Sequence, residues 1–283
     1  MNWKTFLSRI LLIAVAFPVI GALIFLLPQL HHLAFNLLVA GASVVGALET
    51  RALVEARKIP TARHLAPILA GTFPLVTWLQ TAGYVPAAVE WYWLAGTMGV
   101  ILLRAVFLSD DRNLQGFLSF VSSSLFVLLY PAFFLSWIVR FSGLAESSLS
   151  ILLFLGLVFG NDMSAYFAGT LWGRATRLNL PISPQKTAVG FIAGIVGSLI
   201  IFTAFQLLAP HVVPESLPLG ILLTVLVGVA VILGDLVESG LKRSAGVKDS
   251  GIVIPGRGGM LDSVDSMVLS APLFYGLLRL FGR

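Results

Sequence analysis

Residues 217–238 read LPLGILLTVLVGVAVILGDLVE, an apolar run that ends on Asp235 and Glu238. A helix needs about 20 apolar residues to cross a bilayer. The charged, glycine-bearing stretch 239–265 follows at once, with the sequence SGLKRSAGVKDSGIVIPGRGGMLDSVD. Because charge beside hydrocarbon is costly, this junction predicts a membrane helix with a site for a charged ligand at its end.

The composition extends this interpretation to the whole chain. Of its 283 residues, 58% are hydrophobic and 11% are charged, whereas soluble domains are about half apolar and a quarter charged. Cysteine is absent, which excludes disulfides, thiolate metal ligands and a cysteine nucleophile. We therefore predict an all-α, polytopic integral membrane protein.

Repeated apolar runs predict about nine transmembrane helices. The first run follows Lys4 and Arg9, but it is too long for a signal peptide and no small-residue cleavage site follows it, so we expect a retained span. The second is expected to continue as a helix in which Arg51 and Glu55 pair at i, i+4. The nine predicted spans are 7–28, 32–50, 64–83, 88–108, 115–138, 147–170, 189–209, 217–238 and 263–281.

The basic residues are distributed unevenly over the predicted loops. With a cytoplasmic N-terminus, 15 of the 18 Lys and Arg residues fall on the cytoplasmic side, and only Arg140, Arg279 and Arg283 fall outside. The opposite orientation would reverse the positive-inside bias. We therefore expect the N-terminus in the cytoplasm and the C-terminus outside. The pI near 9.8 is then explained by topology, and no nucleic-acid partner is predicted.

Intramembrane charges are few in the first half of the chain and frequent in the second. The simplest organisation is one integral membrane domain, residues 1–283. In this interpretation, spans within 1–140 are mainly scaffold and spans within 147–281 carry the functional site.

Acidic residues gather on the predicted cytoplasmic side. One alternative is that each acid only marks a solvated helix end or complements a helix dipole. A single acid fits that alternative well, but the whole set fits it poorly. The set comprises Asp162, Asp235, Glu238, Asp249, Asp262 and Asp265.

Helical spacing groups these acids further. Asp235, Glu238 and Lys242 lie along one helix face with Ser239. A helix that begins near Asp262 would present the carboxylates of Asp262 and Asp265 together. Carboxylates at a membrane edge favour a hard cation such as Mg²⁺, which takes one or two carboxylates and completes its shell with water and substrate phosphate.

Residues suited to binding phosphate surround the acids. Pro255–Gly259 is glycine-rich and can present N–H groups to an anion, and the lysines and arginine of 242–248 can neutralise phosphate oxygens. A second loop, Ser183–Thr187, offers a hydroxyl and an ammonium before a helix start. No Walker A motif is present in the sequence. The combination indicates phosphoryl or nucleotidyl transfer on a lipid.

The spaced residues from Ser239 to Asp265 resemble the signature of phosphatidate cytidylyltransferases, also called CDP-diacylglycerol synthases. The stretches Gly234–Ser239, Asn161–Tyr166 and Ser183–Thr187 resemble that family too, so the motifs cover 161–265, whereas the first half agrees only in hydropathy. The matching signature residues are Ser239, Leu241, Lys242, Arg243, Lys248, Asp249, Gly251, Ile254, Pro255, Gly258, Gly259, Met260, Asp262, Val264 and Asp265.

The resemblance implies an enzyme of the bacterial inner membrane, with its active site on the cytoplasmic side, that converts CTP and phosphatidate to CDP-diacylglycerol and pyrophosphate. It implies Asp235, Lys242, Asp262 and Asp265 as catalytic residues, with the three aspartates holding Mg²⁺. CTP, phosphatidate and membrane lipid are the expected partners; a second cation and a homodimer are left open. The implied substrate- and phosphate-binding residues are Ser183, Lys186, Thr187, Ser239, Arg243, Lys248, Asp249, Arg257, Gly258 and Gly259.

Six positions depart from the family pattern. Val189 stands where the family carries a glutamate, and Ser263 where it carries an arginine, whereas Arg257 replaces a histidine and can still bind phosphate. Two alternatives therefore stay open: a cytidylyltransferase for another lipid phosphate, and a non-catalytic ion-binding transporter or scaffold. The six residues are Met163, Ser164, Gln185, Val189, Arg257 and Ser263.

Overall fold

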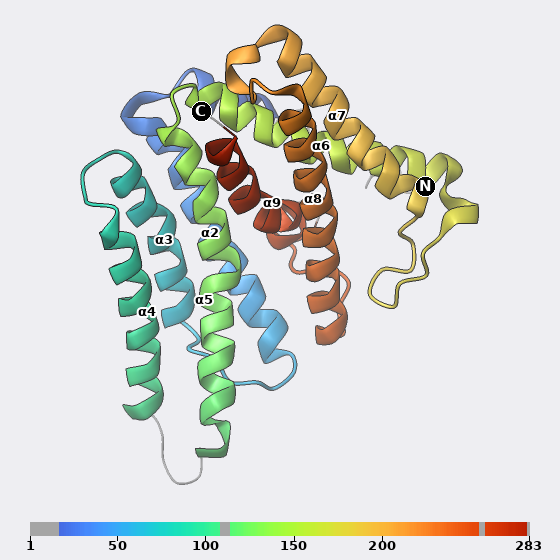
Figure 1. Cartoon of the computed structure of the whole chain (residues 1–283). Coiled ribbons are helices and arrows are strands. Elements are labelled where there is room, and N and C mark those ends of the chain that lie inside the picture. The colour runs from blue at the N-terminus through green and yellow to red at the C-terminus, as the bar shows by residue number, and fades with distance from the viewer. Residues whose placement is uncertain (1–16, 108–113, 255–257, 282–283) are drawn as a thin grey trace. The chain divides into compact units, whose positions relative to one another are not determined.

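The computed structural model describes residues 17–107, 114–254 and 258–281, and helices dominate these ranges (Figure 1). Short 3₁₀ segments flank several helices, and within the described ranges β-structure is limited to isolated bridges. The all-α prediction is confirmed. The helices are α2 (Gln29–Glu55), α3 (Leu65–Thr81), α4 (Ala88–Phe107), α5 (Phe117–Val139), α6 (Ser147–Trp172), α7 (Ala188–Leu208), α8 (Leu217–Ala245) and α9 (Leu261–Leu280).

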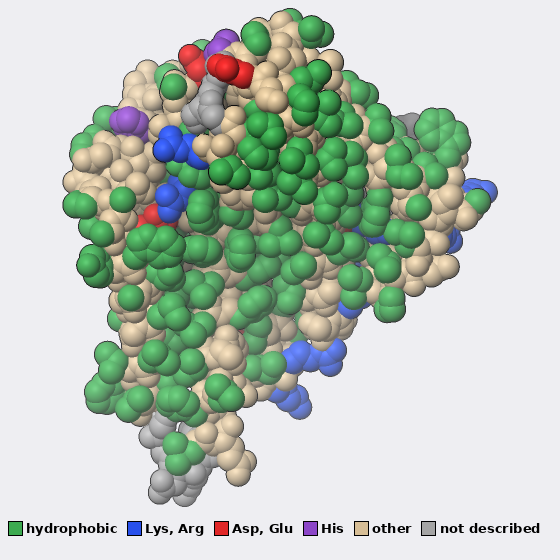
Figure 2. Space-filling model, viewed as in Figure 1, with side chains coloured by type: hydrophobic (Ala, Val, Ile, Leu, Met, Phe, Trp, Pro, Cys, Tyr) green, Lys and Arg blue, Asp and Glu red, His purple; other side chains and the backbone are tan. Residues whose placement is uncertain are grey.

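Five described segments are long and apolar enough to cross a bilayer: α2, α6, α7 and α8, and α5 with its flanking 3₁₀ turns. Helices α3, α4 and α9 coincide with three further predicted spans. Of the first predicted span, 7–28, residues 17–28 are described and 17–25 are helical, and the rest lies outside the described residues. On the face shown in Figure 2, hydrophobic side chains form broad areas that few charged groups interrupt. The protein is therefore an integral membrane protein.

The chain divides into two compact units. Unit 1 comprises residues 1–143 and 244–263, and unit 2 comprises residues 144–243 and 264–283. Most of the signature stretch 239–265 therefore groups with the first half of the chain, and its remainder belongs to unit 2.

Unit 1 is built around helices α2 to α5. Phe73, Ile101 and Leu128 are fully buried in one cluster at their contact. Arg140 forms an ion pair with Glu90, a carboxylate that is only 6% exposed. The expected i, i+4 pair of α2 is present, with 3.7 Å between Arg51 Nε and Glu55 Oε2.

Close backbone contacts hold unit 2 together. A Cβ added at Gly197 of α7 would lie 2.6 Å from the Gly160 carbonyl oxygen of α6, and one added at Gly234 of α8 would lie 2.4 Å from the Asp265 carbonyl oxygen of α9. Membrane helices often approach through such small residues, because lipid gives no hydrophobic drive for association. The contact at Gly234 fixes α8 against the part of α9 that belongs to unit 2.

We expect Gly234→Ala to destabilise unit 2 by about 1–3 kcal/mol, because a backbone oxygen cannot move aside as a side chain can. Thermal unfolding of the protein in detergent micelles measures the loss. Gly276→Ala in α9 is the matched control, since a Cβ there meets nothing within 4 Å, and it should leave the unfolding temperature unchanged or higher. Equal unfolding temperatures for the two variants would contradict the contact.

Candidate active site

In unit 1, a buried carboxylate holds the start of α9. Glu49 of α2 is 6% exposed and accepts hydrogen bonds from the backbone N–H groups of Met260 and Leu261, both at 2.8 Å. It also lies 3.0 Å from the Ser250 hydroxyl. The first N–H groups of a helix have no partner within the helix. Glu49 supplies that partner from a helix more than 200 residues earlier in the chain.

Asp262 closes the same loop from its other side. Its Oδ2 accepts from the Gly259 N–H at 2.7 Å and from the Ser250 N–H at 2.9 Å, and it lies 2.9 Å from the Ser250 hydroxyl. Ser250 therefore touches both carboxylates. The prediction that a helix begins near Asp262 is confirmed, since α9 begins at Leu261.

The signature glycines leave room for these carboxylates. A Cβ at Gly259 would lie 2.1 Å from the Ser250 hydroxyl oxygen, and one at Gly251 would lie 2.5 Å from Glu49 Oε1. Gly258 has φ +115°, a conformation that residues with a Cβ rarely adopt. It also exchanges backbone hydrogen bonds with Ile254 at 2.8 and 3.0 Å. The glycines thus allow close contact between backbone and carboxylate.

The other predicted unit 1 residues lie at the surface of this loop. Lys248 and Asp249 are exposed. Ser263 stands where the family carries an arginine. Its hydroxyl oxygen lies 3.4 Å from the Gly259 carbonyl oxygen. Arg257, with Pro255 and Gly256, lies outside the described residues.

In unit 2, the loop before α7 carries Lys186 to Asp235 of α8, and the two side chains form an ion pair. Bridges between Arg177 and Thr187 and between Leu180 and Ser183 fold this loop back on itself. The Lys186 and Asp235 side chains are 35% and 22% exposed, so a ligand can reach both groups.

Thr187 has a local role in the same loop. It is the N-cap of α7, where its hydroxyl accepts from the Gly190 N–H at 3.0 Å, and it is only 6% exposed. A side-chain cap of this kind stabilises a helix by about 1 kcal/mol. The predicted phosphate contact of Thr187 stays a prediction.

The C-terminal end of α8 carries a second ion pair, between Lys242 and Glu238. Glu238 is fully buried and the Lys242 side chain is 12% exposed. The pair confirms that the two residues share a helix face. Ser239, on the same turn, is half-buried, whereas Arg243 is exposed.

Acids of α6 and α9 complete the polar groups of unit 2. The Ser266 hydroxyl lies 3.2 and 3.3 Å from the two carboxylate oxygens of Asp162. Asp265 is 7% exposed and accepts from the Ser266 N–H at 2.7 Å. Asn161, next to Asp162, donates to the Ser198 hydroxyl and to the Gly228 carbonyl, both at 3.3 Å. These bonds link α6 to α7, α8 and α9.

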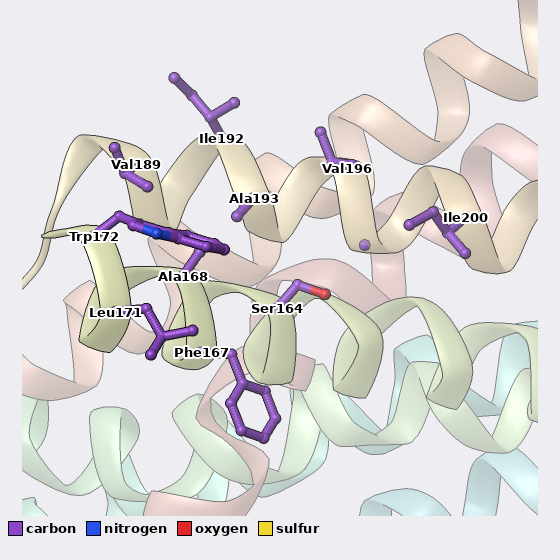
Figure 3. A pocket seen from close by; sticks show the side chains of 11 residues that line it. Ser164, Phe167, Ala168, Leu171, Trp172, Val189, Ile192, Ala193, Val196 and Ile200 are labelled. Atoms are coloured by element: carbon purple, nitrogen blue, oxygen red, sulfur yellow. The ribbon is translucent and has the colours of Figure 1, made fainter.

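An apolar groove of about 460 Å³ runs between α6 and α7. Figure 3 shows the Trp172 ring across its end near Val189, with Ser164 and Ile200 toward the other end. Val189 and Ser164 are two of the departures from the family pattern. A glutamate in place of Val189 would set a carboxylate among apolar side chains, so the valine suits this groove.

Among the described residues, no group of three or more His, Cys, Asp or Glu side chains is arranged to hold a metal ion. Magnesium does not require such a group, because one or two carboxylates, water and substrate phosphate can fill its shell. Asp235 fits that requirement, since it is partly exposed and already balanced by a flexible cation.

The helices and their clustered acids and lysines define an integral membrane protein with ionic groups at its helix ends. The chain belongs to the cytidylyltransferase family, whose model matches residues 7–281. It is thus a member of that family over nearly its whole length.

Curated relatives agree with this assignment. The chain is 46% identical over 125 residues to a phosphatidate cytidylyltransferase of Bacillus subtilis (strain 168), a match that covers 44% of this chain and 45% of the relative. It is 47% identical over 120 residues to one of Synechocystis, covering 42% and 39%. It is 35% identical over 192 residues to one of Staphylococcus epidermidis, covering 68% and 72%. The matches to the first two span about half the length of those relatives or less.

Glu49 is not among the site residues predicted from the sequence. It lies near the end of the predicted span 32–50, and no role was predicted for it. The signal was present, because a carboxylate within an apolar run is costly and needs a partner. The partners are backbone N–H groups, however, and a sequence gives no direct sign of those.

We expect Lys242→Met to destabilise unit 2 by about 3–5 kcal/mol, because it removes the cation from a fully buried carboxylate. The double variant Glu238→Gln/Lys242→Met should recover part of this loss, since a neutral amide is cheaper to bury. Thermal unfolding in micelles measures both. Arg243→Met, which removes an exposed cation next to it, is the control and should change stability little. A Lys242→Met protein as stable as this control would disprove the coupling.

Proposed function

We propose that the protein transfers the cytidylyl group of CTP to phosphatidate, giving CDP-diacylglycerol and pyrophosphate. The observation that carries this proposal is the hydrogen-bonded loop of the signature, in which Asp262 is fixed by Ser250 and Gly259. Three proteins that this chain resembles are phosphatidate cytidylyltransferases. An anionic lipid and an anionic nucleotide both need cations, and the lysines and arginine of 242–248 supply them.

The reaction needs positioning more than acid–base chemistry. A phosphatidate oxygen attacks the α-phosphorus of CTP, a new P–O bond forms, and the bond to the bridging oxygen breaks with its electron pair leaving on pyrophosphate. The lipid phosphate is already an anion at neutral pH, so no base has to activate it. Lys186, Lys242 and Lys248 are proposed to neutralise phosphate oxygens as charge develops. Gly258 and Gly259 are proposed to let a phosphate approach the loop closely, since their own N–H groups donate to the Ile254 carbonyl and to Asp262 Oδ2.

We infer that Mg²⁺ accompanies the nucleotide, with Asp235, Asp262 and Asp265 as its candidate carboxylate ligands. One or two of them suffice for a magnesium ion whose shell is completed by phosphate and water. When bound, the ion would withdraw charge from the phosphates and orient them. The partial exposure of Asp235 and its pairing with Lys186 support its candidacy, because a lysine can move aside when another cation arrives.

We also propose that the chain crosses the bacterial inner membrane nine times, with its N-terminus and the proposed active site on the cytoplasmic side. Eight described helices coincide with predicted spans, and the bias of 15 basic residues against 3 supports the orientation.

The chain lacks cysteine, so single-cysteine variants can test this orientation directly. Ala175 and Ser216 are both exposed and lie in loops on opposite predicted sides. We expect a membrane-impermeant maleimide to label Ser216→Cys on spheroplasts, and to label Ala175→Cys only after permeabilisation. The reverse pattern would invert the topology, and labelling of both on spheroplasts would contradict the single crossing by α7 between the two positions.

Purified protein in micelles should form CDP-diacylglycerol from CTP and phosphatidate, with product measured from radiolabelled CTP. EDTA should abolish the reaction, and added Mg²⁺ should restore it. Asp235→Asn should lower the rate by at least about 100-fold, since even outer-shell partners of metal ligands cost 10–100-fold. Glu146→Gln, an exposed acid of the same unit, should keep wild-type activity.

Absence of product from folded wild-type protein would refute the proposal. The apolar groove lined by Val189 and Ser164 favours one alternative, a cytidylyltransferase for a different lipid phosphate. A panel of acceptors in the same assay separates the two, because the alternative predicts product with another lipid phosphate only. A transporter or scaffold would give product with none.

A further inference from the structure

Glu49 is placed to act on the proposed reaction without touching its substrates. It lies on α2, far in sequence from the signature, yet three of its hydrogen-bond contacts go to signature-loop residues Ser250, Met260 and Leu261. All lie within unit 1. Two of the three partners are backbone N–H groups, which hold the loop whatever its side chains are.

The contacts divide between the two oxygens of the carboxylate. Oε1 accepts from the Met260 N–H, and Oε2 accepts from the Leu261 N–H and faces the Ser250 hydroxyl. Both oxygens are therefore required as acceptors. An amide has only one acceptor oxygen, and its NH₂ group would face a backbone N–H or compete for the single oxygen.

The loop that Glu49 holds is the loop that orients Asp262. Gly259 donates to Asp262 Oδ2, and the next two residues donate to Glu49. Ser250 contacts both carboxylates, at 3.0 and 2.9 Å. A displacement of the 259–261 backbone would therefore move the Asp262 carboxylate directly.

Glycine contacts make this coupling stiff. A Cβ at Gly251 or Gly259 would lie 2.5 Å from a Glu49 oxygen, so the backbone lies directly against the carboxylate on two sides. Such close packing leaves the loop little freedom to shift while Glu49 stays in place.

We propose that Glu49 is a positioning residue for nucleotidyl transfer: it fixes residues 259–261 and Ser250 so that Asp262 meets the substrate complex in one orientation. This inference rests on the proposed function. Glu49 is not proposed to contact substrate or metal. Its role is to hold the signature loop from α2 through hydrogen bonds.

The test compares Glu49→Gln, Glu49→Asp and the control Glu55→Gln. Glu55 lies on the same helix and pairs with Arg51 and Thr61 outside the signature. We expect Glu49→Gln to lower kcat by about 10–100-fold and to raise the Mg²⁺ concentration for half-maximal rate by a similar factor, as outer-shell changes do. The KM for phosphatidate should stay within about threefold. Glu49→Asp keeps both acceptor oxygens and should retain more activity than Glu49→Gln.

A merely structural role predicts a different pattern. Loss of folded protein would lower activity in proportion to the folded fraction, with the Mg²⁺ requirement unchanged. Rates are therefore expressed per folded molecule, measured by size-exclusion chromatography. Wild-type kcat and Mg²⁺ requirement in folded Glu49→Gln would overturn the proposal.

Hydrogen exchange gives a readout that does not depend on activity. Peptides covering 258–264 should exchange faster in Glu49→Gln than in the wild type, while they remain protected in Glu55→Gln. Unchanged exchange would show that Glu49 does not hold the loop and would also overturn the proposal. If the wild type makes no CDP-lipid, the proposed function fails, and the exchange result still decides whether Glu49 holds the loop.

Discussion

A carboxylate buried among apolar helices must receive its hydrogen-bond donors and cations from the protein, because hydrocarbon offers none. Glu49 and Glu238 meet this requirement in different ways. Glu49 takes backbone N–H groups from the start of α9, and Glu238 takes the Lys242 ammonium one turn along its own helix. Each solution fixes a neighbouring part of the signature, so satisfying a buried charge also orders residues that the proposed chemistry uses.

The glycines of the signature follow from the same constraint. The N–H groups of Gly259, Met260 and Leu261 reach carboxylate oxygens at 2.7–2.8 Å, and glycines of the same loop leave room for those carboxylates. At Gly251, Gly258 and Gly259 a Cβ would lie within 2.6 Å of a carboxylate or hydroxyl oxygen. From the sequence, this glycine-rich segment is predicted to bind phosphate. In the structure, Gly251, Gly258 and Gly259 make room for the Glu49 and Asp262 carboxylates and the Ser250 hydroxyl. Phosphate binding by Gly258 and Gly259 stays a proposal.

Hydropathy predicted the helices closely because a bilayer imposes their length. The expected span 217–238 became α8, Leu217–Ala245, and its extra turns are those that bring Lys242 to Glu238. Local spacing also predicted the Arg51–Glu55 pair and the start of α9. Contacts between distant segments were out of reach: nothing in the sequence linked Lys186 to Asp235, or Glu49 to Met260. Such pairs depend on tertiary packing, and hydropathy does not show which residues of two packed helices face each other.

Four of the positions where the chain departs from the family lie at the margin of these networks or outside them. The Ser263 hydroxyl contacts the Gly259 carbonyl within its own helix turn. Gln185 is exposed, and Val189 and Ser164 line the apolar groove. Among the described residues, none of these four side chains is a hydrogen-bond or ion-pair partner of Glu49, Asp262 or Asp235 in the contacts that fix those carboxylates. The substitutions thus change surfaces that a ligand would meet and leave the internal frame intact. A change of acceptor lipid is for this reason a more natural consequence of them than a loss of the reaction itself.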